Sequence, residues 1–172
     1  MTSPVTIRRF AGADAAAVRD LFVRVNRLLS PPGQRAAFED YIALSIAEEI
    51  GRIEAYYAER GGAFFVAEDE TRLAGIFGLE RVSSEAMELR RMYVEPALRR
   101  RGVARAMLTF AEAECARRGC ATLELSTSEL QREALAFYRN AGYVLEREET
   151  AAAASNKTVG GGIRRYYFSK RL

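Results

Sequence analysis

The strongest constraint on the fold is a strand that leads through one short turn into a helix. Residues 87–94 read M-E-L-R-R-M-Y-V, a pattern typical of a strand, and Pro96 closes it. From Gly102 onward the apolar residues recur at helical spacing, and Gly119 supplies a stop signal at the far end. The turn between these elements therefore delivers the chain directly into the first turn of a helix.

Further helices and strands are predicted on both sides of this unit. Two helical patterns precede it, one over 14–29 with Asp14 as its N-cap and one over 38–57 with a break near Gly51; a short helix over 129–140 follows it. The other strands are expected at 5–10, 63–68, 73–82, 122–126, 143–148 and 163–172. This order predicts an α/β or α+β fold, a mixed sheet flanked by helices. The 172 residues suit one domain, so 1–172 is expected to be a single domain.

Histidine is absent from the chain, and this limits the chemistry that it can perform. Ser-His-Asp triads, His metal sites and imidazole bases are excluded, so acid–base work must use a carboxylate, Tyr, Cys, a backbone group or water. The two cysteines, Cys115 and Cys120, cannot complete a zinc tetrahedron by themselves and are expected to be buried and unpaired. We therefore expect no metal cofactor.

The net charge of +3 is concentrated in one segment. Residues 96–105 hold four arginines and no acid, so the rest of the chain carries a net charge of −1. The first ten residues lack the apolar stretch of a signal peptide, and no apolar run approaches the ~18 residues of a membrane span. We therefore expect a soluble, cytoplasmic protein whose basic segment serves a local purpose.

That basic segment has the features of an anion site. A helix N-terminus presents unpaired N–H groups and about half a positive charge. Gly102 allows a bulky anion to approach the backbone closely, and four arginine side chains add charge around it. The predicted ligand is a phosphate or pyrophosphate. The alternative is a solvated basic turn with an ordinary glycine. The arginines concerned are Arg99, Arg100, Arg101 and Arg105.

The spacing R-x-x-G-x-A at Arg99, Gly102 and Ala104 resembles the (Q/R)-x-x-G-x-(G/A) acyl-CoA signature of the GCN5-related N-acetyltransferases, the GNAT family. The preceding E-L-R-R-M-Y-V-E-P resembles the fourth strand of that family, and the following T-L-E-L-S resembles its fifth. Residues 134–143, A-L-A-F-Y-R-N-A-G-Y, are similar to the family's A-x-x-(L/F)-Y-x-x-x-G-(F/Y) motif. The resemblance covers 63–148 and implies a mixed, mostly antiparallel sheet of six or seven strands with about four helices.

The resemblance also implies an enzyme, an N-acetyltransferase that uses acetyl-CoA as co-substrate. Backbone groups of Met92 and Val94 would hold the pantetheine arm and polarise the thioester carbonyl. Tyr138 would protonate the departing thiolate, and Gln131 stands where many relatives carry an asparagine that contacts the pantetheine. The pyrophosphate would lie on backbone amides of the basic turn. The complete cofactor-binding set is Met92, Tyr93, Val94, Arg99, Arg100, Arg101, Gly102, Val103, Ala104, Arg105, Gln131 and Tyr138.

Transfer to an amine needs a proton acceptor. An alkyl ammonium has a pKa near 10.4, so presenting it neutral at pH 7 costs about 4.6 kcal/mol. Glu88 is the first candidate for the base, since its spacing before Arg99 is similar to that of a strand glutamate in some relatives. Alternation would place Glu88, Arg90, Met92 and Val94 on one face of the strand. Glu80, acting through water, is the second candidate, and a structural ion pair is the alternative for Glu88.

The acceptor is expected to be a primary amine of a small molecule, attacked directly in a ternary complex. Residues 126–131, S-T-S-E-L-Q, resemble a patch in acetyltransferases that act on small amino acids or cysteine conjugates. Loops at 26–33 and 150–162 are expected to help form the pocket. No nucleic-acid or membrane partner is expected, and the sequence leaves the choice between a monomer and a homodimer open.

Three alternative functions remain open. The first is a non-catalytic acyl-CoA-binding regulatory domain of the same fold, which would bind acetyl-CoA without turnover. The second is a protein lysine or N-terminal acetyltransferase. The third is a nucleic-acid-binding module that uses the arginine cluster, which predicts a salt-sensitive affinity for RNA or DNA. Against the third, the cations are confined to one turn and lack interleaved aromatic residues.

Overall fold

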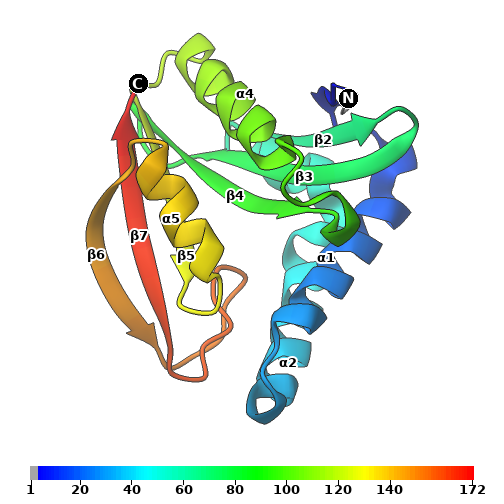
Figure 1. The fold of residues 1–172 in the computed structure, drawn as a ribbon, viewed down its shortest axis with the longest axis vertical. Coiled ribbons are helices and arrows are strands. Elements are labelled where there is room, and N and C mark those ends of the chain that lie inside the picture. The colour runs from blue at the N-terminus through cyan, green and yellow to red at the C-terminus, as the bar shows by residue number, and fades with distance from the viewer. Residues whose placement is uncertain (1–3) are drawn as a thin grey trace.

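A twisted seven-stranded sheet organises residues 4–172, the part of the chain that the computed structural model describes (Figure 1). The strand order is β1-β2-β3-β4-β5-β7-β6, and β4–β5 is the parallel pair in this otherwise antiparallel sheet. This confirms the mixed, mostly antiparallel sheet predicted from the sequence. The strands are β1 (Thr6–Arg9), β2 (Ala63–Asp69), β3 (Arg72–Arg81), β4 (Ala86–Val94), β5 (Thr122–Ser128), β6 (Val144–Ala151) and β7 (Ile163–Arg171).

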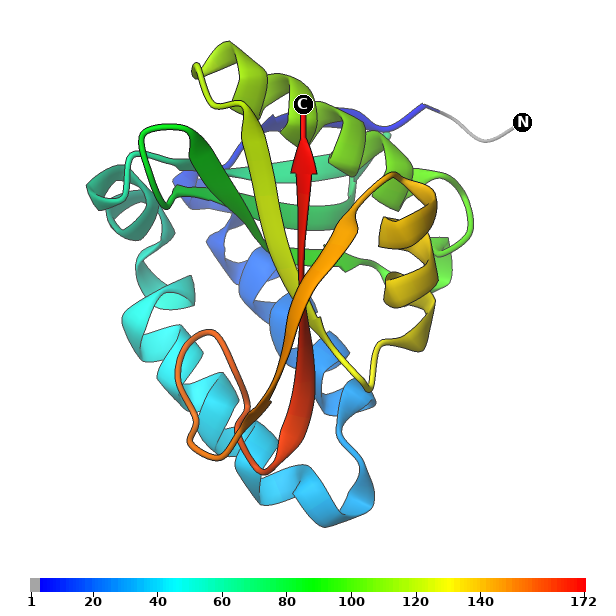
Figure 2. The same ribbon diagram turned by 90° about the vertical axis from the view of Figure 1, so that its left-hand side faces the viewer.

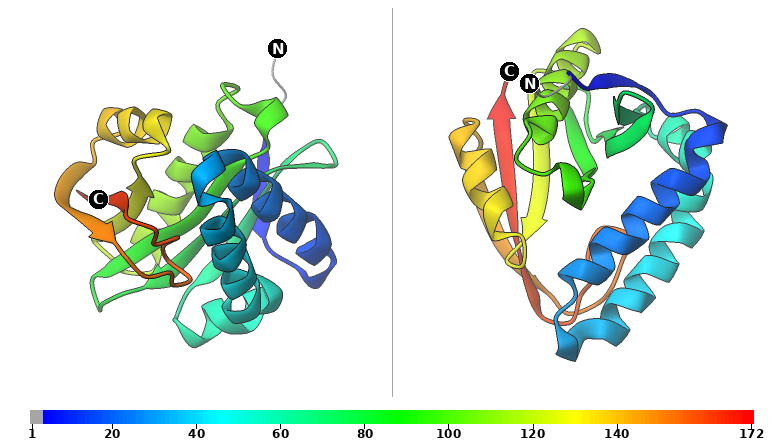
Figure 3. Two further views of the ribbon diagram at one scale, coloured as in Figure 1. Left: turned by 90° about the horizontal axis from the view of Figure 1, so that it is seen from below. Right: turned by 45° about the vertical axis from the view of Figure 1, so that its right-hand side comes forward.

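Helices cover both faces of the sheet. The N-terminal helices pack on one face, where α1 and α2 run side by side (Figure 3), and α4 and α5 pack on the other. The helices are α1 (Ala15–Leu29), α2 (Arg35–Glu48), α3 (Ile53–Glu59), α4 (Val103–Arg117) and α5 (Arg132–Asn140), with single 3₁₀ turns at Gly12–Asp14, Pro32–Gln34, Ile50–Arg52 and Pro96–Leu98. None of the helices in this part of the chain has the length and apolarity that crossing a bilayer requires.

The two cores follow from the alternation of side chains along the strands. In β2, Phe65 and Ala67 belong to the core under α4 and α5, whereas Phe64 and Val66 belong to the core under the N-terminal helices. All four are buried, which explains why this strand reads as a continuous apolar run. Full burial of each phenylalanine contributes roughly 1.5–3 kcal/mol.

The N-terminal helices differ in two details from a simple helical reading. Asp14 occupies the N-cap position of α1, as predicted, but its side chain does not cap this helix. A 3₁₀ turn precedes α1, and the Asp14 carboxylate instead accepts the Ala11 amide at 2.8 Å and pairs with Arg8 at 2.8 Å. The Asp14 carboxylate therefore stabilises the 3₁₀ turn at Gly12–Asp14, which precedes α1. The predicted break near Gly51 is confirmed, because a 3₁₀ turn separates α2 from α3.

The β4–β5 pair separates partway along its length (Figure 1). Register is kept only between Ala86–Leu89 of β4 and Thr122–Leu125 of β5. Beyond this stretch, β4 pairs only with β3, and β5 pairs only with β7. Each strand therefore keeps one backbone edge without a strand partner. Figure 2 shows β7 between β5 and β6, with the loop from β6 to β7 reaching toward α2.

Candidate active site

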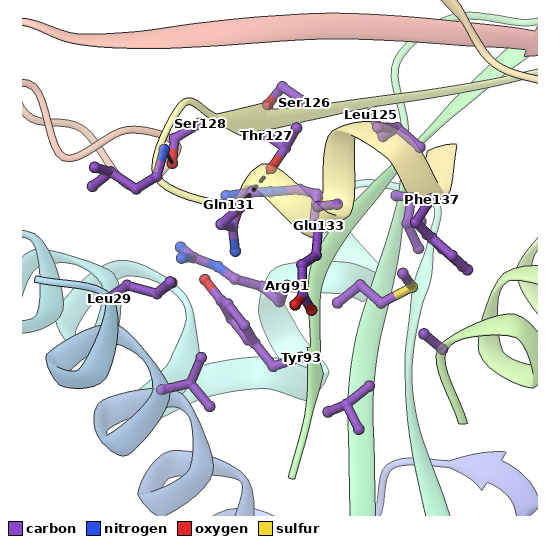
Figure 4. A pocket seen from close by; sticks show the side chains of 18 of the residues that line it. Leu29, Arg91, Tyr93, Leu125, Ser126, Thr127, Ser128, Gln131, Glu133 and Phe137 are labelled. Atoms are coloured by element: carbon purple, nitrogen blue, oxygen red, sulfur yellow. Dashed lines mark hydrogen bonds between the residues drawn. The ribbon is translucent and has the colours of Figure 1, made fainter. Parts of the chain in front are cut away.

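A cavity of about 710 Å³ lies where β4 and β5 separate (Figure 4). Its walls come from the last turns of α1, from α2, from β4 and β5, from the N-terminal turn of α4 and from α5. Residues 156–159 of the β6–β7 loop and the start of β7 complete it. This is the size of pocket that holds most of a small molecule.

A bulge in β4 shapes this cavity. Ile76 pairs with Tyr93 and Gly78 pairs with Arg90, so two β4 residues, Arg91 and Met92, lie opposite the single residue between Ile76 and Gly78. Arg91 has φ of 55°, a left-handed conformation that costs about 1–2 kcal/mol for a residue other than glycine. Such bulges bend and twist a strand, and here the bend follows the last β4–β5 register pair.

The bulge corrects the predicted orientation of β4 side chains. Glu88, Arg90, Met92 and Val94 do not share one face. Arg90 contacts Glu49 at the end of α2, whereas Met92 and Val94 pack against the core under α4. The reason is the extra residue at the bulge, since inserting one residue reverses the alternation beyond it.

The backbone of the strand beyond the bulge has a free edge. The Glu95 amide donates to the Ala74 carbonyl of β3 at 2.8 Å. Because backbone groups alternate between the two edges of a strand, Tyr93 also faces β3, and the groups of Met92 and Val94 face the opening. These two residues are the ones that the sequence predicted to offer backbone hydrogen bonds.

The turn between β4 and α4 presents a second set of free donors. Arg100 and Gly102 have φ of 62° and 81°, and the first helical bond runs from Ala106 N–H to Gly102 O at 3.0 Å. Amides 100–105 donate to no backbone acceptor within residues 4–172. A Cβ at Gly102 would meet no atom within 4 Å, so the space over the turn is open. This is the geometry of an anion site at a helix N-terminus.

The four arginines of this turn are exposed but not equivalent. Arg99, Arg100 and Arg105 line the cavity, whereas Arg101 is not among its lining residues. Arg100 pairs with Glu133 of α5 at 3.0 Å across the mouth of the cavity. The predicted cofactor-binding set therefore converges on one cavity, with Arg101 outside its wall.

Tyr138 of α5 lines the cavity and is 7% exposed. Its ring packs against Phe137, Tyr143 and Phe168, with centroids 5.2, 5.8 and 6.3 Å away. Within residues 4–172 its hydroxyl makes no hydrogen bond, and it is not an enclosed polar atom, so it is accessible from the cavity. Burial raises the pKa of this phenol well above its ordinary value, so the group keeps its proton at neutral pH.

Gln131 is the first residue before α5 and also lines the cavity. Its side-chain oxygen accepts a hydrogen bond from the Thr127 hydroxyl at 2.6 Å (Figure 4). The amide is thereby held in one orientation toward the separated strands.

The two predicted bases lie side by side but in different settings. Glu88 lines the cavity, 3.4 Å from Lys157 Nζ and 3.7 Å from Arg90 Nε. Glu80, its register partner on β3, does not line the cavity and accepts a hydrogen bond from Arg90 Nη1 at 2.8 Å. Glu88 is therefore the carboxylate with direct access to the cavity, and both acids are already near cations.

A buried polar cluster around Glu49 is a feature that the sequence did not reveal. Glu49 is fully buried, and one of its oxygens accepts from Arg91 Nη2 at 2.6 Å and from Arg90 Nη2 at 3.1 Å. The other accepts from the Tyr57 hydroxyl at 2.5 Å. Burial opposes ionisation, but the charges of Arg91 and Arg90 outweigh it and hold the pKa of Glu49 below its usual value. The cluster ties the end of α2 to the β4 bulge.

The β6–β7 loop is anchored on the same cluster. The Asn156 carbonyl accepts from Arg90 and Arg91, and its side-chain amide donates to the Tyr56 hydroxyl at 3.1 Å. Farther along, Gln34 donates to the Gly161 carbonyl at 3.1 Å. The expected contribution of loop 150–162 to the pocket is confirmed for residues 156–159. The expected contribution of 26–33 comes instead from the last turns of α1.

The chain is similar to known proteins in sequence as well as in structure. Residues 60–145, half of the chain, match the acetyltransferase (GNAT) domain family, and the chain belongs to this family of acetyltransferases. Human N-acetyltransferase 8 is 26% identical over 110 residues, 60% of this chain and 48% of that protein. The uncharacterised N-acetyltransferase YjgM of Escherichia coli is 30% identical over 90 residues, 51% of this chain and 54% of that protein. The chain thus spans about half the length of these relatives.

Solved structures show the same fold. The PaiA N-acetyltransferase of Thermoplasma acidophilum, solved in complex with coenzyme A, has a TM-score of 0.77 at 16% identity and covers 98% of this chain and 99% of its own. A GNAT acetyltransferase of Elizabethkingia anophelis, solved with acetyl-CoA bound, has a TM-score of 0.64 at 12% identity, with 98% of both chains covered. The sheet, the helices and their order are those of the GNAT fold.

Proposed function

We propose that this protein is an N-acetyltransferase that moves an acetyl group from acetyl-CoA to a primary amine of a small molecule. The observation that carries this proposal is the convergence of three features on one cavity. These are the free β4 edge, the unpaired amides at the start of α4 and the buried phenol of Tyr138. Family membership supports the same reaction class.

The free donors fit a coenzyme A molecule in order along its length. The amides of residues 100–105 would hold the pyrophosphate, with the surrounding arginines adding charge. The backbone of Met92 and Val94 would bind the pantetheine arm as an added strand does, and Gln131 would contact it from α5. The same β4 donors would polarise the thioester carbonyl.

Acetyl-CoA, when bound, supplies an acetyl thioester: the amine nitrogen bonds to its carbonyl carbon, the C–S bond breaks, and one proton passes in net from nitrogen to sulfur. Tyr138 would donate the proton at its hydroxyl, since burial keeps the phenol neutral. A general acid of this kind contributes about 10²–10⁴ in rate. Holding amine and thioester together in one cavity supplies several more kcal/mol.

Glu88 would accept the proton of the amine. It lies on the side of the sheet covered by α1 and α2, where the acceptor would enter between these helices and the β6–β7 loop. Presenting the amine in its neutral form at pH 7, when its ammonium pKa is near 10.4, costs about 4.6 kcal/mol, and a proton acceptor offsets part of this cost. Glu80, behind Glu88, is the second candidate, with a water as carrier.

A small acceptor suits the cavity better than a protein chain does. The β6–β7 loop is anchored through Asn156, and residues 156–159 line the acceptor side and limit its width. The exposed arginines of the α4 turn would serve the cofactor phosphates, so their presence is accounted for without a nucleic-acid partner. The cytoplasmic location stays a prediction from the sequence, and the choice between a monomer and a homodimer stays open.

The test is a screen of an amine library with acetyl-CoA, followed by release of free thiol. Turnover on small amines supports the proposal. Tight acetyl-CoA binding without turnover on any amine supports a regulatory acyl-CoA-binding domain instead, and turnover only on peptides supports a protein acetyltransferase.

A further inference from the structure

We infer that the acceptor amine also carries a carboxylate, which Arg165 of β7 binds together with Ser126 of β5; this rests on the proposed acetyl transfer. Arg165 lines the cavity, is half-buried, and donates from Nη2 to the Ser126 hydroxyl at 2.8 Å. Nothing in the proposed reaction uses this arginine.

Arg165 differs from the other cations of the cavity in its pairing. The buried arginines of the Glu49 cluster, the Arg100 side chain and Lys157 each lie within 4.0 Å of a carboxylate. Arg165 has no carboxylate within that distance in residues 4–172. Its register partner on β6, Glu149, pairs with Arg147 instead. Three further cations of the cavity have no acid partner in the described part of the chain, but they are exposed and lie at the starts of α4 and α5: Arg99, Arg105 and Arg132.

The strand register places Arg165 on the acceptor side of the sheet. It lies opposite Ser128, and Ser126 and Glu124 follow at two-residue spacing on the same face. Leu123, Leu125 and Thr127 are buried on the other face, so this face is not the one under α4. Glu124 is in turn the register partner of Glu88. Arg165 and the candidate base therefore share one face.

The distance between the two groups suits a small molecule. Ser126 lies two residues along the strand from Glu124 and one strand away from Glu88. With a rise of about 3.3 Å per residue and strands about 4.8 Å apart at the Glu88–Glu124 pair, the Glu88 and Ser126 Cα atoms are at least roughly 8 Å apart. An amine at Glu88 and a carboxylate at Arg165 can thus belong to one amino-acid-sized molecule.

Lys157 indicates the polarity of such a molecule. Its ammonium reaches from the β6–β7 loop to within 3.4 Å of Glu88 and 3.6 Å of Glu80. The acidic end of the cavity therefore already accommodates an alkyl ammonium. At the opposite end, Arg165 has no acid partner among the described residues. A zwitterionic acceptor would match both ends.

The guanidinium has the capacity for this contact. An arginine carries five N–H donors in a planar fork that matches a carboxylate. The Ser126 oxygen accepts from Arg165, so its own O–H is free to donate to the same carboxylate. The structure thus points to amino acids and related amino-carboxylates as the substrate class.

The test compares each of the twenty L-amino acids with its α-carboxamide and with the amine formed by its decarboxylation, as acceptors for acetyl-CoA. The wild-type protein is expected to prefer the acids. In Arg165→Gln, kcat/KM for the preferred acid is expected to fall about 100-fold, the size of a lost charge-assisted contact. In the same variant, kcat/KM for the decarboxylated amine and KM for acetyl-CoA should each change less than threefold.

Arg164→Gln is the matched control. Arg164 is the neighbouring residue, is exposed, and pairs with Glu148 at 3.7 Å outside the cavity. This variant should behave like the wild type, and thermal unfolding would confirm that both variants are folded. Ser126→Ala should lower kcat/KM for the acid by a smaller factor than Arg165→Gln.

The outcomes separate the two proposals. Acetylation of amines without preference for the carboxylate, or an acid preference that survives Arg165→Gln in the folded protein, overturns the assignment of Arg165 and leaves the acetyltransferase intact. Absence of turnover on every amine contradicts the proposed function and with it this inference.

Discussion

At the scale of single residues, Tyr138 and Tyr143 form a natural comparison. Both belong to one aromatic cluster, but the Tyr143 hydroxyl donates to Glu112 at 3.0 Å, whereas that of Tyr138 has no partner within residues 4–172. We expect Tyr138→Phe to lower kcat at least 100-fold, because a general acid is lost. The acetyl-CoA affinity should change less than twofold. Steady-state kinetics and calorimetric titration measure both quantities.

Tyr143→Phe controls for the loss of a phenol from the same cluster, and its kcat should stay within twofold of the wild-type value. Unchanged turnover in Tyr138→Phe would remove this residue as the acid and leave the proton to water.

Glu49 supplies a second prediction at this scale, on stability. Glu49→Gln would leave two buried arginines without their shared carboxylate, and breaking such a pair typically costs about 3–5 kcal/mol. Urea unfolding at pH 7 measures the loss. Glu39→Gln, which breaks an exposed pair with Arg27, should change the midpoint little.

The same carboxylate predicts a pH dependence. The folded state holds the pKa of Glu49 below its usual value, so its contribution to stability is complete above pH ~4.5 and is lost as the pH falls through the lower, folded pKa. Glu49→Gln should therefore flatten the acid limb of the stability curve. An unchanged acid limb would show that other carboxylates, such as Asp14, account for it.

At the scale of elements, the N-terminus of α4 predicts the strongest loss of cofactor binding. Gly102→Glu would place a carboxylate in open space directly over the amides that would hold the pyrophosphate. We expect the acetyl-CoA Kd to rise more than 100-fold through charge and bulk. Calorimetric titration measures it.

Gly119→Glu is a matched control at the other end of the same helix. Gly119 also has a positive φ, 77°, and also has no atom within 4 Å of an added Cβ. Both substitutions carry the same backbone penalty, so only Gly102→Glu should lose the cofactor. Intact binding in Gly102→Glu would contradict the anion site.

These elements also show what the sequence could predict and why. The strand, the basic turn and α4 were predictable because each depends on local signals: alternation, a proline, a glycine and helical spacing. The bulge at Arg91 was not predictable, because a two-residue period cannot reveal the residue at which it shifts. The correct faces of Met92 and Val94 therefore required the structure.

The Glu49 cluster could not be predicted from the sequence, for a different reason. Its ion pairs join residues more than 40 positions apart, and Glu49 itself follows an apolar helical pattern in which an acid usually reads as exposed. The same holds for Arg165, whose significance lies in having no acid partner within residues 4–172. Contacts between distant segments decide which charged side chains are paired, and a single sequence does not show these contacts.

At the scale of the whole molecule, the gap between β4 and β5 can be reached from both faces of the sheet. Met92, Val94 and Tyr138 belong to the core under α4 and α5, whereas Glu88 and Arg165 lie on the face toward α1 and α2. In the proposed reaction the cofactor would therefore reach the gap between β4 and β5 from one side and the acceptor from the other. In this arrangement both would be bound at once, so no residue would need to carry the acetyl group between them.

The cysteines support the same conclusion. Both are buried and unpaired, as predicted, and burial raises the pKa of Cys115 to about 11, which keeps the thiol protonated and a poor nucleophile. Neither cysteine lines the cavity. We therefore expect initial-rate lines for varied acetyl-CoA and amine to intersect, and intact-mass measurement with acetyl-CoA alone to show no acetylated protein. Parallel lines together with a cysteine-linked acetyl group would require an acyl-enzyme, and with it a rearrangement that brings a buried thiol to the separated strands.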